Sequence, residues 1–187
     1  MAFEYLKSLS GGMDRSCVLS ELMGAYGEDV WNYAFFLTRD HALSDDITQD
    51  VFVKVYEKMY SFRGESSVRT WLLAITRNLV RDHWRSAWFR RVIPFGSPRR
   101  EEHGPSAESL AVSQLVTEEV WAVVLALPRK LREVLLLHAH HGLSYAEIAA
   151  LLDLSQGTVK SRLSRARAKV SKELEREGRE QHESQNG

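Results

Sequence analysis

The residues of this sequence best suited to chemistry are two groups of cations, and the chemistry they could do is the binding of a polyanion. Residues 154–172 hold 6 Lys and Arg and no acidic residue, and residues 64–100 hold 8 Lys and Arg against 2 Asp and Glu. The segments around them are acidic, so the 187-residue chain has a formal net charge of zero. Clustered charge, rather than the total, is the electrostatic signature of a nucleic-acid partner. On charge alone, the two basic segments could instead be the solvated faces of ordinary helices.

The C-terminal basic segment has the pattern of a DNA-reading helix. One side of its helical wheel is apolar: Val159, Leu163, Ala166 and Val170. The opposite side carries Lys160, Ser161, Ser164, Arg165 and Lys172, and the flanks carry Arg162, Arg167 and Lys169. Outward residues near the start of such a helix can meet base edges in the major groove, while flanking cations can reach phosphates. A purely structural helix normally mixes charge signs on its solvated face.

A helix-turn-helix would position these residues. Ser144 and Glu147 match a capping box that begins a short helix. Asp153 and Leu154 form a short turn, and Ser155 is a suitable N-cap for the basic helix. Two short helices joined so tightly can pack at a steep angle.

The N-terminal basic segment predicts a helix over 68–86 with Leu72, Ile75 and Leu79 on its buried side. Arginines recur every four residues on another side, with an asparagine beside them: Arg77, Arg81, Arg85 and Asn78. The aromatic residues of this part are Phe62, Trp71, Trp84, Trp88 and Phe89. Cations that follow a backbone, with rings on which bases can stack, are typical of single-strand binding. For Trp71, a place in the core is the simpler interpretation.

Two further helices precede this segment. The first, over 29–38, has the apolar stripe Val30, Tyr33, Ala34 and Leu37. The second, from Ser44 as N-cap to about Tyr60, has the stripe Ile47, Val51, Val55 and Met59, widened by Phe52 and Tyr56. Its outward strip is Asp46, Gln49, Asp50, Val53 and Glu57. Such an acidic strip could dock a basic protein surface, or be an ordinary solvated face.

The expected fold class is all-α, with two small helical domains joined by a flexible linker and a helix-turn-helix in the second. Three of the four prolines fall between residues 86 and 117, where helical periodicity lapses. The expected organisation is an N-terminal extension (1–19), a first domain (20–90), a linker (91–115), a second domain (116–173) and an acidic tail (174–187). The tail is expected to fray after a short helical continuation.

Other classes of function find little support. His138, His140 and His141 lack a cysteine or an acidic pair at ligand spacing, so we expect no metal site. Asp82 and His83 have no nucleophile or phosphate loop with them, so we expect neither catalysis nor a cofactor. Cys17 is expected to act as a small apolar residue. The chain shows neither a membrane-spanning apolar run nor a secretory signal, which favours a cytoplasmic protein without membrane insertion.

Three motifs, described below in chain order, resemble those of the sigma-70 family, specifically of the extracytoplasmic-function group that keeps only regions 2 and 4. The resemblance covers about residues 20–90 and 115–173. The first motif is Asp45-Asp46-Ile47-Thr48-Gln49-Asp50-Val51-Phe52. The second is Phe62-Arg63-Gly64 with Thr70-Trp71-Leu72, Ile75, Asn78, Asp82 and Arg85. The third is Leu127-Pro128, residues 143–149 and Gly157-Thr158-Val159-Lys160-Ser161-Arg162.

The resemblance implies a factor that binds core RNA polymerase, recognises promoter DNA and helps to open it. The polymerase clamp helices would meet Asp46, Gln49, Asp50 and Phe52. The loop from Phe62 to Ser67 would capture a base flipped from the minus-ten element, with Asn78 lining the pocket and Arg77, Arg81 and Arg85 holding the melted strand. The minus-thirty-five element would be read by Lys160, Ser161, Ser164 and Arg165, with Arg162 and Arg167 at its phosphates. A bulkier residue often stands at the position of Ser164.

The resemblance also implies that an anti-sigma factor can hold the protein inactive. Two other functions remain open at this point. One is a stand-alone helix-turn-helix regulator, which would need neither the aromatic arginine block nor the acidic strip. The other is an adaptor that binds proteins through its helical faces.

Overall fold

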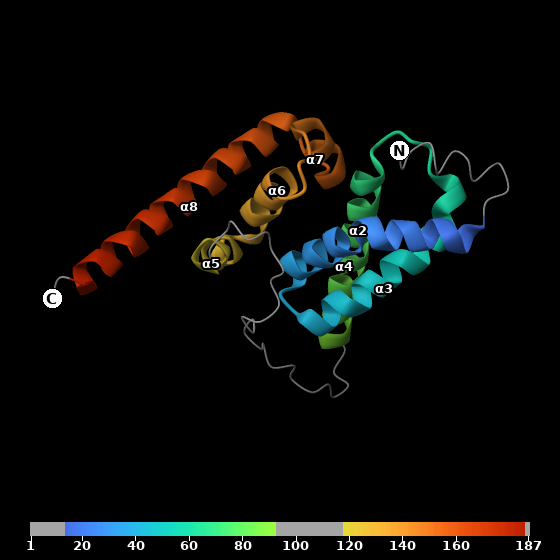
Figure 1. The fold of residues 1–187 in the computed structure, drawn as a ribbon, viewed down its shortest axis with the longest axis horizontal. Coiled ribbons are helices and arrows are strands. Elements are labelled where there is room, and N and C mark those ends of the chain that lie inside the picture. The colour runs from blue at the N-terminus through green and yellow to red at the C-terminus, as the bar shows by residue number, and fades with distance from the viewer. Residues whose placement is uncertain (1–13, 93–117, 186–187) are drawn as a thin grey trace. The chain divides into compact units, whose positions relative to one another are not determined.

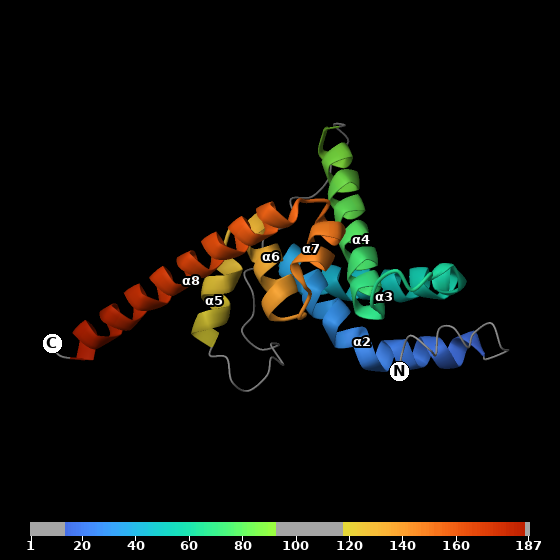
Figure 2. The same ribbon diagram turned by 90° about the horizontal axis from the view of Figure 1, so that it is seen from above.

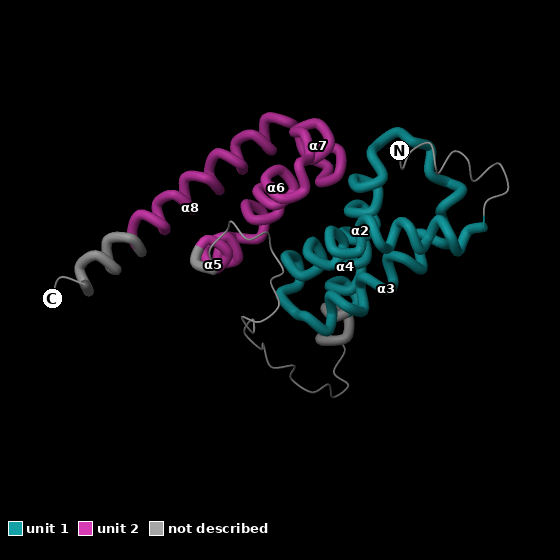
Figure 3. Tube along the Cα trace, in the orientation of Figure 1, with its two compact units in different colours: residues 1–106 teal, residues 107–187 magenta. Residues whose placement is uncertain are grey.

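The computed structural model describes residues 14–92 and 118–185, and all regular secondary structure in these two ranges is helical (Figure 1). This confirms the predicted all-α class. The chain divides into two compact helical units, residues 1–106 and 107–187 (Figure 3). The predicted linker, 91–115, lies almost wholly outside the described residues. No helix in the described parts is long and apolar enough to cross a membrane.

The first unit consists of α2 (Arg15–Thr38), α3 (His41–Lys58), the short 3-10 helix η2 (Met59–Ser61) and α4 (Val68–Val92). Helices α2 and α3 lie side by side, and α4 crosses them steeply (Figures 1 and 2). Both apolar stripes predicted for α2 and α3 are buried, which confirms the periodicity argument. The fully buried aromatic rings of this core belong to Tyr33, Phe35 and Phe36.

The predicted start of α3 at Ser44 is wrong. Asp40 is the N-cap, because its carboxylate accepts a hydrogen bond from the backbone N–H of Leu43 at 3.0 Å. Ser44 is instead fully buried inside the helix, where its hydroxyl donates to the carbonyl of Asp40 at 2.6 Å. A serine that bonds back to the preceding turn satisfies its own polar group and so tolerates burial.

The buried face of α4 is rotated relative to the prediction. Leu72 is buried as expected, but Ile75 and Leu79 are only half-buried. Leu73, Thr76 and Val80 complete the buried face. The hydroxyl of Thr76 donates to the carbonyl of Leu72 at 2.9 Å, which satisfies this polar residue inside the core.

Two helix bounds also differ from the sequence prediction. Helix α4 continues past Ser86 to Val92, two residues before Pro94, and the residue preceding a proline disfavours helical geometry. Helix α2 begins at Arg15, well before residue 29. Cys17, expected to behave as an apolar residue, is exposed on its first turns.

The second unit consists of α5 (Glu118–Ala126), α6 (Arg129–Ala139), α7 (Tyr145–Leu152) and α8 (Gln156–Gln185). Helices α5, α6 and α7 gather along the N-terminal part of α8 (Figure 2). The guanidinium of Arg132 donates to the carbonyl of Leu125 at 2.5 Å, which satisfies an end group of α5. Pro128 precedes α6, and its carbonyl accepts from the N–H of Leu131 at 2.8 Å.

The predicted fraying of the tail is wrong, because α8 continues without interruption to Gln185. The residues after Glu173 are mostly Glu, Arg and Gln, which favour helix. Glu173 and Arg176 form an ion pair one turn apart, a spacing that supports an exposed helix. The recognition residues and the tail therefore share one helix.

Candidate nucleic-acid interface

Two hydrogen-bonded caps set the geometry of the helix-turn-helix. Ser144 and Glu147 form the predicted capping box: the Ser144 hydroxyl accepts from the Glu147 N–H at 3.3 Å, and the Glu147 carboxylate accepts from the Ser144 N–H at 2.9 Å. Ser155 caps α8, accepting from the N–H of Thr158 at 3.1 Å. Between them, Asp153 has a positive φ of 56° and ends α7. Each cap typically contributes about 1 kcal/mol to helix stability.

Helix α8 has one buried side and one exposed side in the part after Ser155. Val159, Leu163 and Ala166 are at most 1% exposed and fix the rotation of the helix. The exposed side carries Lys160, Ser164, Arg165, Arg167, Lys169 and Lys172. The predicted site residues Ser161 and Arg162 are half-buried, and the Ser161 hydroxyl donates to the carbonyl of Thr158 at 3.1 Å. Of the predicted base-reading residues, Lys160, Ser164 and Arg165 are thus exposed on α8, whereas Ser161 is not fully exposed.

The arginines of α4 form a second cationic face. Arg81 and Arg85 are exposed, while Arg77 is half-buried. Trp84 lies between Arg81 and Arg85 in sequence and is 42% exposed. An exposed ring beside cations matches the requirements of single-strand binding.

The loop before α4 brings Phe62 against this helix. The rings of Phe62 and Trp71 lie 5.0 Å apart, and both residues are half-buried. Asn78 is exposed and stands seven residues after Trp71, or about two helical turns along the same side. Phe62, Trp71 and Asn78 thus lie on or against one side of α4.

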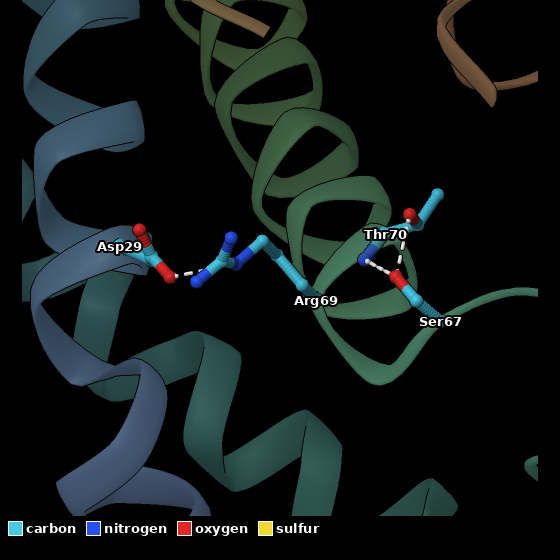
Figure 4. Close-up of polar contacts among 4 residues, drawn as sticks. All are labelled: Asp29, Ser67, Arg69 and Thr70. Atoms are coloured by element: carbon cyan, nitrogen blue, oxygen red, sulfur yellow. Dashed lines mark hydrogen bonds and ion pairs between the residues drawn. The ribbon is translucent and has the colours of Figure 1, made fainter. Parts of the chain in front are cut away.

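The end of this loop is anchored at Ser67 and Arg69, as Figure 4 shows. The Ser67 hydroxyl accepts from the N–H of Thr70 at 3.0 Å and lies 2.8 Å from the Thr70 hydroxyl. The guanidinium of Arg69 lies 3.0 Å from the carboxylate of Asp29 on α2. These contacts fix the first turn of α4 and therefore the point at which the loop 62–67 ends.

The predicted acidic strip of α3 is exposed, whereas Phe52, which the family resemblance adds to the docking residues, is buried. Asp46, Gln49 and Asp50 are exposed, and Val53 beside them is 57% exposed. Phe52, predicted as a docking residue, is only 5% exposed. Its ring packs in the core because it lies on the apolar side of the helix, so it supports the strip from below rather than meeting a partner directly.

One feature near this strip escaped the sequence analysis. Tyr56, assigned to the apolar side of α3, is 40% exposed, and Tyr60 is 56% exposed. The guanidinium carbon of Arg15 lies 4.1 Å from the ring centroid of Tyr60 and 5.7 Å from that of Tyr56. The spacing of the two tyrosines at i and i+4 was a signal for a shared face, but the cation comes from α2, from a residue distant in sequence.

The histidines near the end of α6 take part in local packing. Nδ1 of His138 lies 2.9 Å from the carbonyl oxygen of Leu143, and its ring lies 5.1 Å from that of Tyr145. His140 meets Trp121 edge-on at 5.9 Å. These contacts link α6 to α5 and to the helix-turn-helix.

The fold and these faces define a class: a two-unit helical protein with a helix-turn-helix and a basic, outward-facing second helix. Comparison with known families is consistent with this class. The model of sigma-70 region 2 matches residues 22–90, and that of sigma-70 region 4 matches residues 117–170. The chain belongs to the sigma-70 family, within its extracytoplasmic-function group.

Its curated relatives are RNA polymerase sigma factors. The extracytoplasmic-function factor SigC of Mycobacterium tuberculosis is 36% identical over 160 residues, covering 86% of this chain and 85% of the relative. The sigma-E factor of Escherichia coli is 32% identical over 141 residues, covering 70% of this chain and 73% of the relative.

Two solved structures share the fold. CnrH, solved in complex with the cytosolic domain of CnrY, has a TM-score of 0.63 and 26% identity, covering 94% of this chain and 98% of that one. The sigma factor RpoE, solved with the anti-sigma factor NepR from Bartonella quintana, has a TM-score of 0.66 and 24% identity, covering 83% and 96%.

Proposed function

We propose that the protein is an alternative sigma factor that binds core RNA polymerase and directs initiation at a limited set of promoters. The observation that carries this proposal is the pairing of two exposed basic faces, one on each unit, in a chain of the sigma-70 family. Residues 20–90 would serve as region 2 and residues 116–173 as region 4. The protein would act in the cytoplasm, without an enzymatic reaction of its own.

The second unit would read duplex DNA at the minus-thirty-five element. The residues that would meet base edges lie in the first turns of α8: Lys160, Ser164 and Arg165, which are exposed, and Ser161, which is half-buried. Arg162 and Arg167 lie to either side and would hold phosphates. Ser164 offers only a short hydroxyl, so we expect Arg165 to dominate base discrimination.

The first unit would act on the melted strand at the minus-ten element. Extracting a base from the stack costs a few kcal/mol, so a pocket for that base selects sequence through melting. The loop 62–67, anchored at Ser67, and Asn78 would form this pocket. Arg77, Arg81 and Arg85 would hold the strand's backbone, with the exposed ring of Trp84 available for stacking.

The acidic strip of α3 would dock on the polymerase. Asp46, Gln49 and Asp50 are exposed and carry the charge that a basic partner surface requires. Two modest DNA contacts held on one polymerase become effectively intramolecular, so their affinities reinforce each other. This would explain how short contact faces suffice for promoter selection.

We also propose that an anti-sigma factor controls the protein by covering these exposed faces. The similar protein CnrH is solved in complex with the cytosolic domain of CnrY, which supports the binding of a second protein by this fold. Competition between such a factor and core polymerase for the purified chain would test it.

Transcription in vitro with core polymerase and genomic fragments tests the main proposal. We expect new start sites that require both the chain and the polymerase. If the chain binds promoter fragments but produces no start site with polymerase, it is a stand-alone helix-turn-helix regulator. If it binds no DNA in either setting, an adaptor remains.

A further inference from the structure

Helix α2 contains two glycines that are not needed to make room for a neighbouring residue. Gly24 and Gly27 lie in the interior of the helix, where a glycine is less stable than an alanine. A Cβ atom at either position would meet no described atom within 4 Å outside its own part of the helix. Glycine lets the backbone bend, and α2 changes direction along its length (Figure 2). The two glycines therefore make this part of α2 the easiest to bend.

The two parts of α2 on either side of the glycines are held to different degrees. Seven of the residues at 30–37 are buried, and the carboxylate of Asp29 forms an ion pair with Arg69 of α4 at 3.0 Å. Among the described residues of α2 before the glycines, only Val18 and Leu22 are buried. Local stability follows the amount of apolar surface that a segment buries. The N-terminal part is thus the part of α2 that can move.

The start of α2 is a well-formed helical turn whose contact with α3 is weak. The carboxylate of Asp14 caps the helix by accepting from the N–H of Ser16 at 3.1 Å. The guanidinium carbon of Arg15 lies 4.1 Å from the ring centroid of Tyr60 and 5.7 Å from that of Tyr56. A cation over exposed rings changes a population by a factor of only about two to five. This contact can therefore be broken and remade easily.

The two rings under Arg15 continue the acidic strip of α3. Asp50, Val53, Tyr56 and Tyr60 follow one another at spacings of three or four residues, and all four are exposed. Such spacing places residues on one face of a helix. A basic protein surface that docks along this face would meet the guanidinium of Arg15 at its aromatic end, where the like charge opposes the approach.

We propose that residues 15–23 form a hinged cover on the polymerase-docking face of α3. The cover turns about Gly24 and Gly27, holds Arg15 over the two tyrosines in the free protein, and opens when core RNA polymerase docks. This inference rests on the proposed function and adds a regulatory step to the docking strip. Because only the open form presents the whole face, the apparent affinity for polymerase is proportional to the open fraction.

The first test stiffens the hinge. Gly24→Ala has room for its Cβ atom and favours the straight helix by a factor of about five. In the free full-length chain, the amides of residues 25–28 should exchange hydrogen about fivefold more slowly. Affinity for core polymerase, measured by titration calorimetry, should fall about fivefold although the protein becomes more stable to heat. The matched control is Ser20→Ala, which raises helix propensity at an exposed position outside the hinge and should leave the affinity unchanged.

The second test releases the cover. Arg15→Ala should raise the affinity for core polymerase about two- to fivefold, because the closed form loses its cation–ring contact. Arg15→Lys keeps a cation over the rings and should stay close to the wild type. Lys58→Ala is the control for charge, since it removes an exposed cation from the end of α3 but not from the docking face.

Opposite shifts of affinity for Gly24→Ala and Arg15→Ala are the expected result. If Gly24→Ala does not weaken binding, or Arg15→Ala does not strengthen it, the inference is overturned. An equal loss with Ser20→Ala would show that the segment unfolds rather than turns, and an equal gain with Lys58→Ala would show that charge alone is responsible; either result also overturns it. In all these cases the wild-type chain still binds polymerase, so the proposed function stands. If the wild-type chain does not bind core polymerase, the proposed function fails and the inference with it.

Discussion

Replacing Ser67 with alanine should impair promoter opening while leaving duplex recognition intact. Ser67 is the last residue of the loop 62–67 and the N-cap of α4, and its hydroxyl accepts from the Thr70 N–H at 3.0 Å. Alanine removes this acceptor and frees the first turn of α4 to fray. The proposed base pocket would then lose its fixed end.

The size of the effect can be worked out from the cap. Loss of a serine N-cap costs about 1 kcal/mol. Since 1.4 kcal/mol corresponds to a factor of ten, the ratio of ordered to frayed first turn should fall about fivefold. The ion pair of Arg69 with Asp29 holds the same turn from α2, but a partly exposed pair contributes less than about 1 kcal/mol and cannot replace the cap.

The assay is the rate of promoter opening by holoenzyme, followed by a fluorescent base in the minus-ten element. We expect Ser67→Ala to reduce the rate by up to about fivefold. This factor is the free energy lost with the cap, converted to the ratio of ordered to frayed first turn. Ser67→Asn should restore most of the rate, because asparagine is also a good N-cap. Ser66→Ala is the matched control, since its hydroxyl bonds only weakly to the Ser67 carbonyl, at 3.3 Å.

An opening rate that Ser67→Ala leaves unchanged would refute the reasoning that the cap orders the pocket. An equal loss of affinity for the minus-thirty-five duplex would refute it too, because that contact belongs to the second unit. Failure of Ser67→Asn to recover the rate would show that the serine acts by something other than its cap.

Three further variants probe the other faces. Arg165→Ala should lower promoter selection at least about fivefold, which corresponds to about 1 kcal/mol, the lower end for a bidentate base contact. Polymerase affinity in a pull-down should stay unchanged, and equal loss of both would contradict the assignment. Asp50→Arg should weaken polymerase binding and spare the minus-thirty-five duplex, and an unaltered pull-down would exclude this role. Leu163→Ala, at a residue 1% exposed, should destabilise the second unit by about 2 to 5 kcal/mol in denaturant unfolding, and a smaller loss would mean that α8 is not anchored there.

The sequence predicted the fold class and the helix-turn-helix well, because local signals dominate there. The capping box at Ser144 and the cap at Ser155 each depend on residues within three positions, and both are present. The apolar stripe of α8 was equally clear, since the acid-free segment left a single apolar side. Local sequence rules suffice where a single helix start and a single helix rotation agree with both the capping residue and the apolar stripe.

The sequence failed where tertiary contacts decide between two local solutions. Ser44 is a good cap by type, but Asp40 takes the cap and the packed core buries the serine. On α4, Thr76 faces the core because it can bond to its own backbone, whereas Ile75 is displaced to the flank. The family resemblance placed Phe52 among the docking residues, but the residue lies on the apolar side of α3 and is buried.

The continuity of α8 has a consequence for how this protein can change by insertion and deletion. Every residue added inside the helix moves the residues after it by about 1.5 Å and turns them by about 100°. One extra residue between Arg165 and Lys169 would therefore turn Lys169 and Lys172 away from the side that bears Arg165. Seven extra residues would shift them by about 10.5 Å and nearly restore their direction. Insertions and deletions in this part of the helix should therefore be tolerated only in steps of about seven residues, which is about two turns.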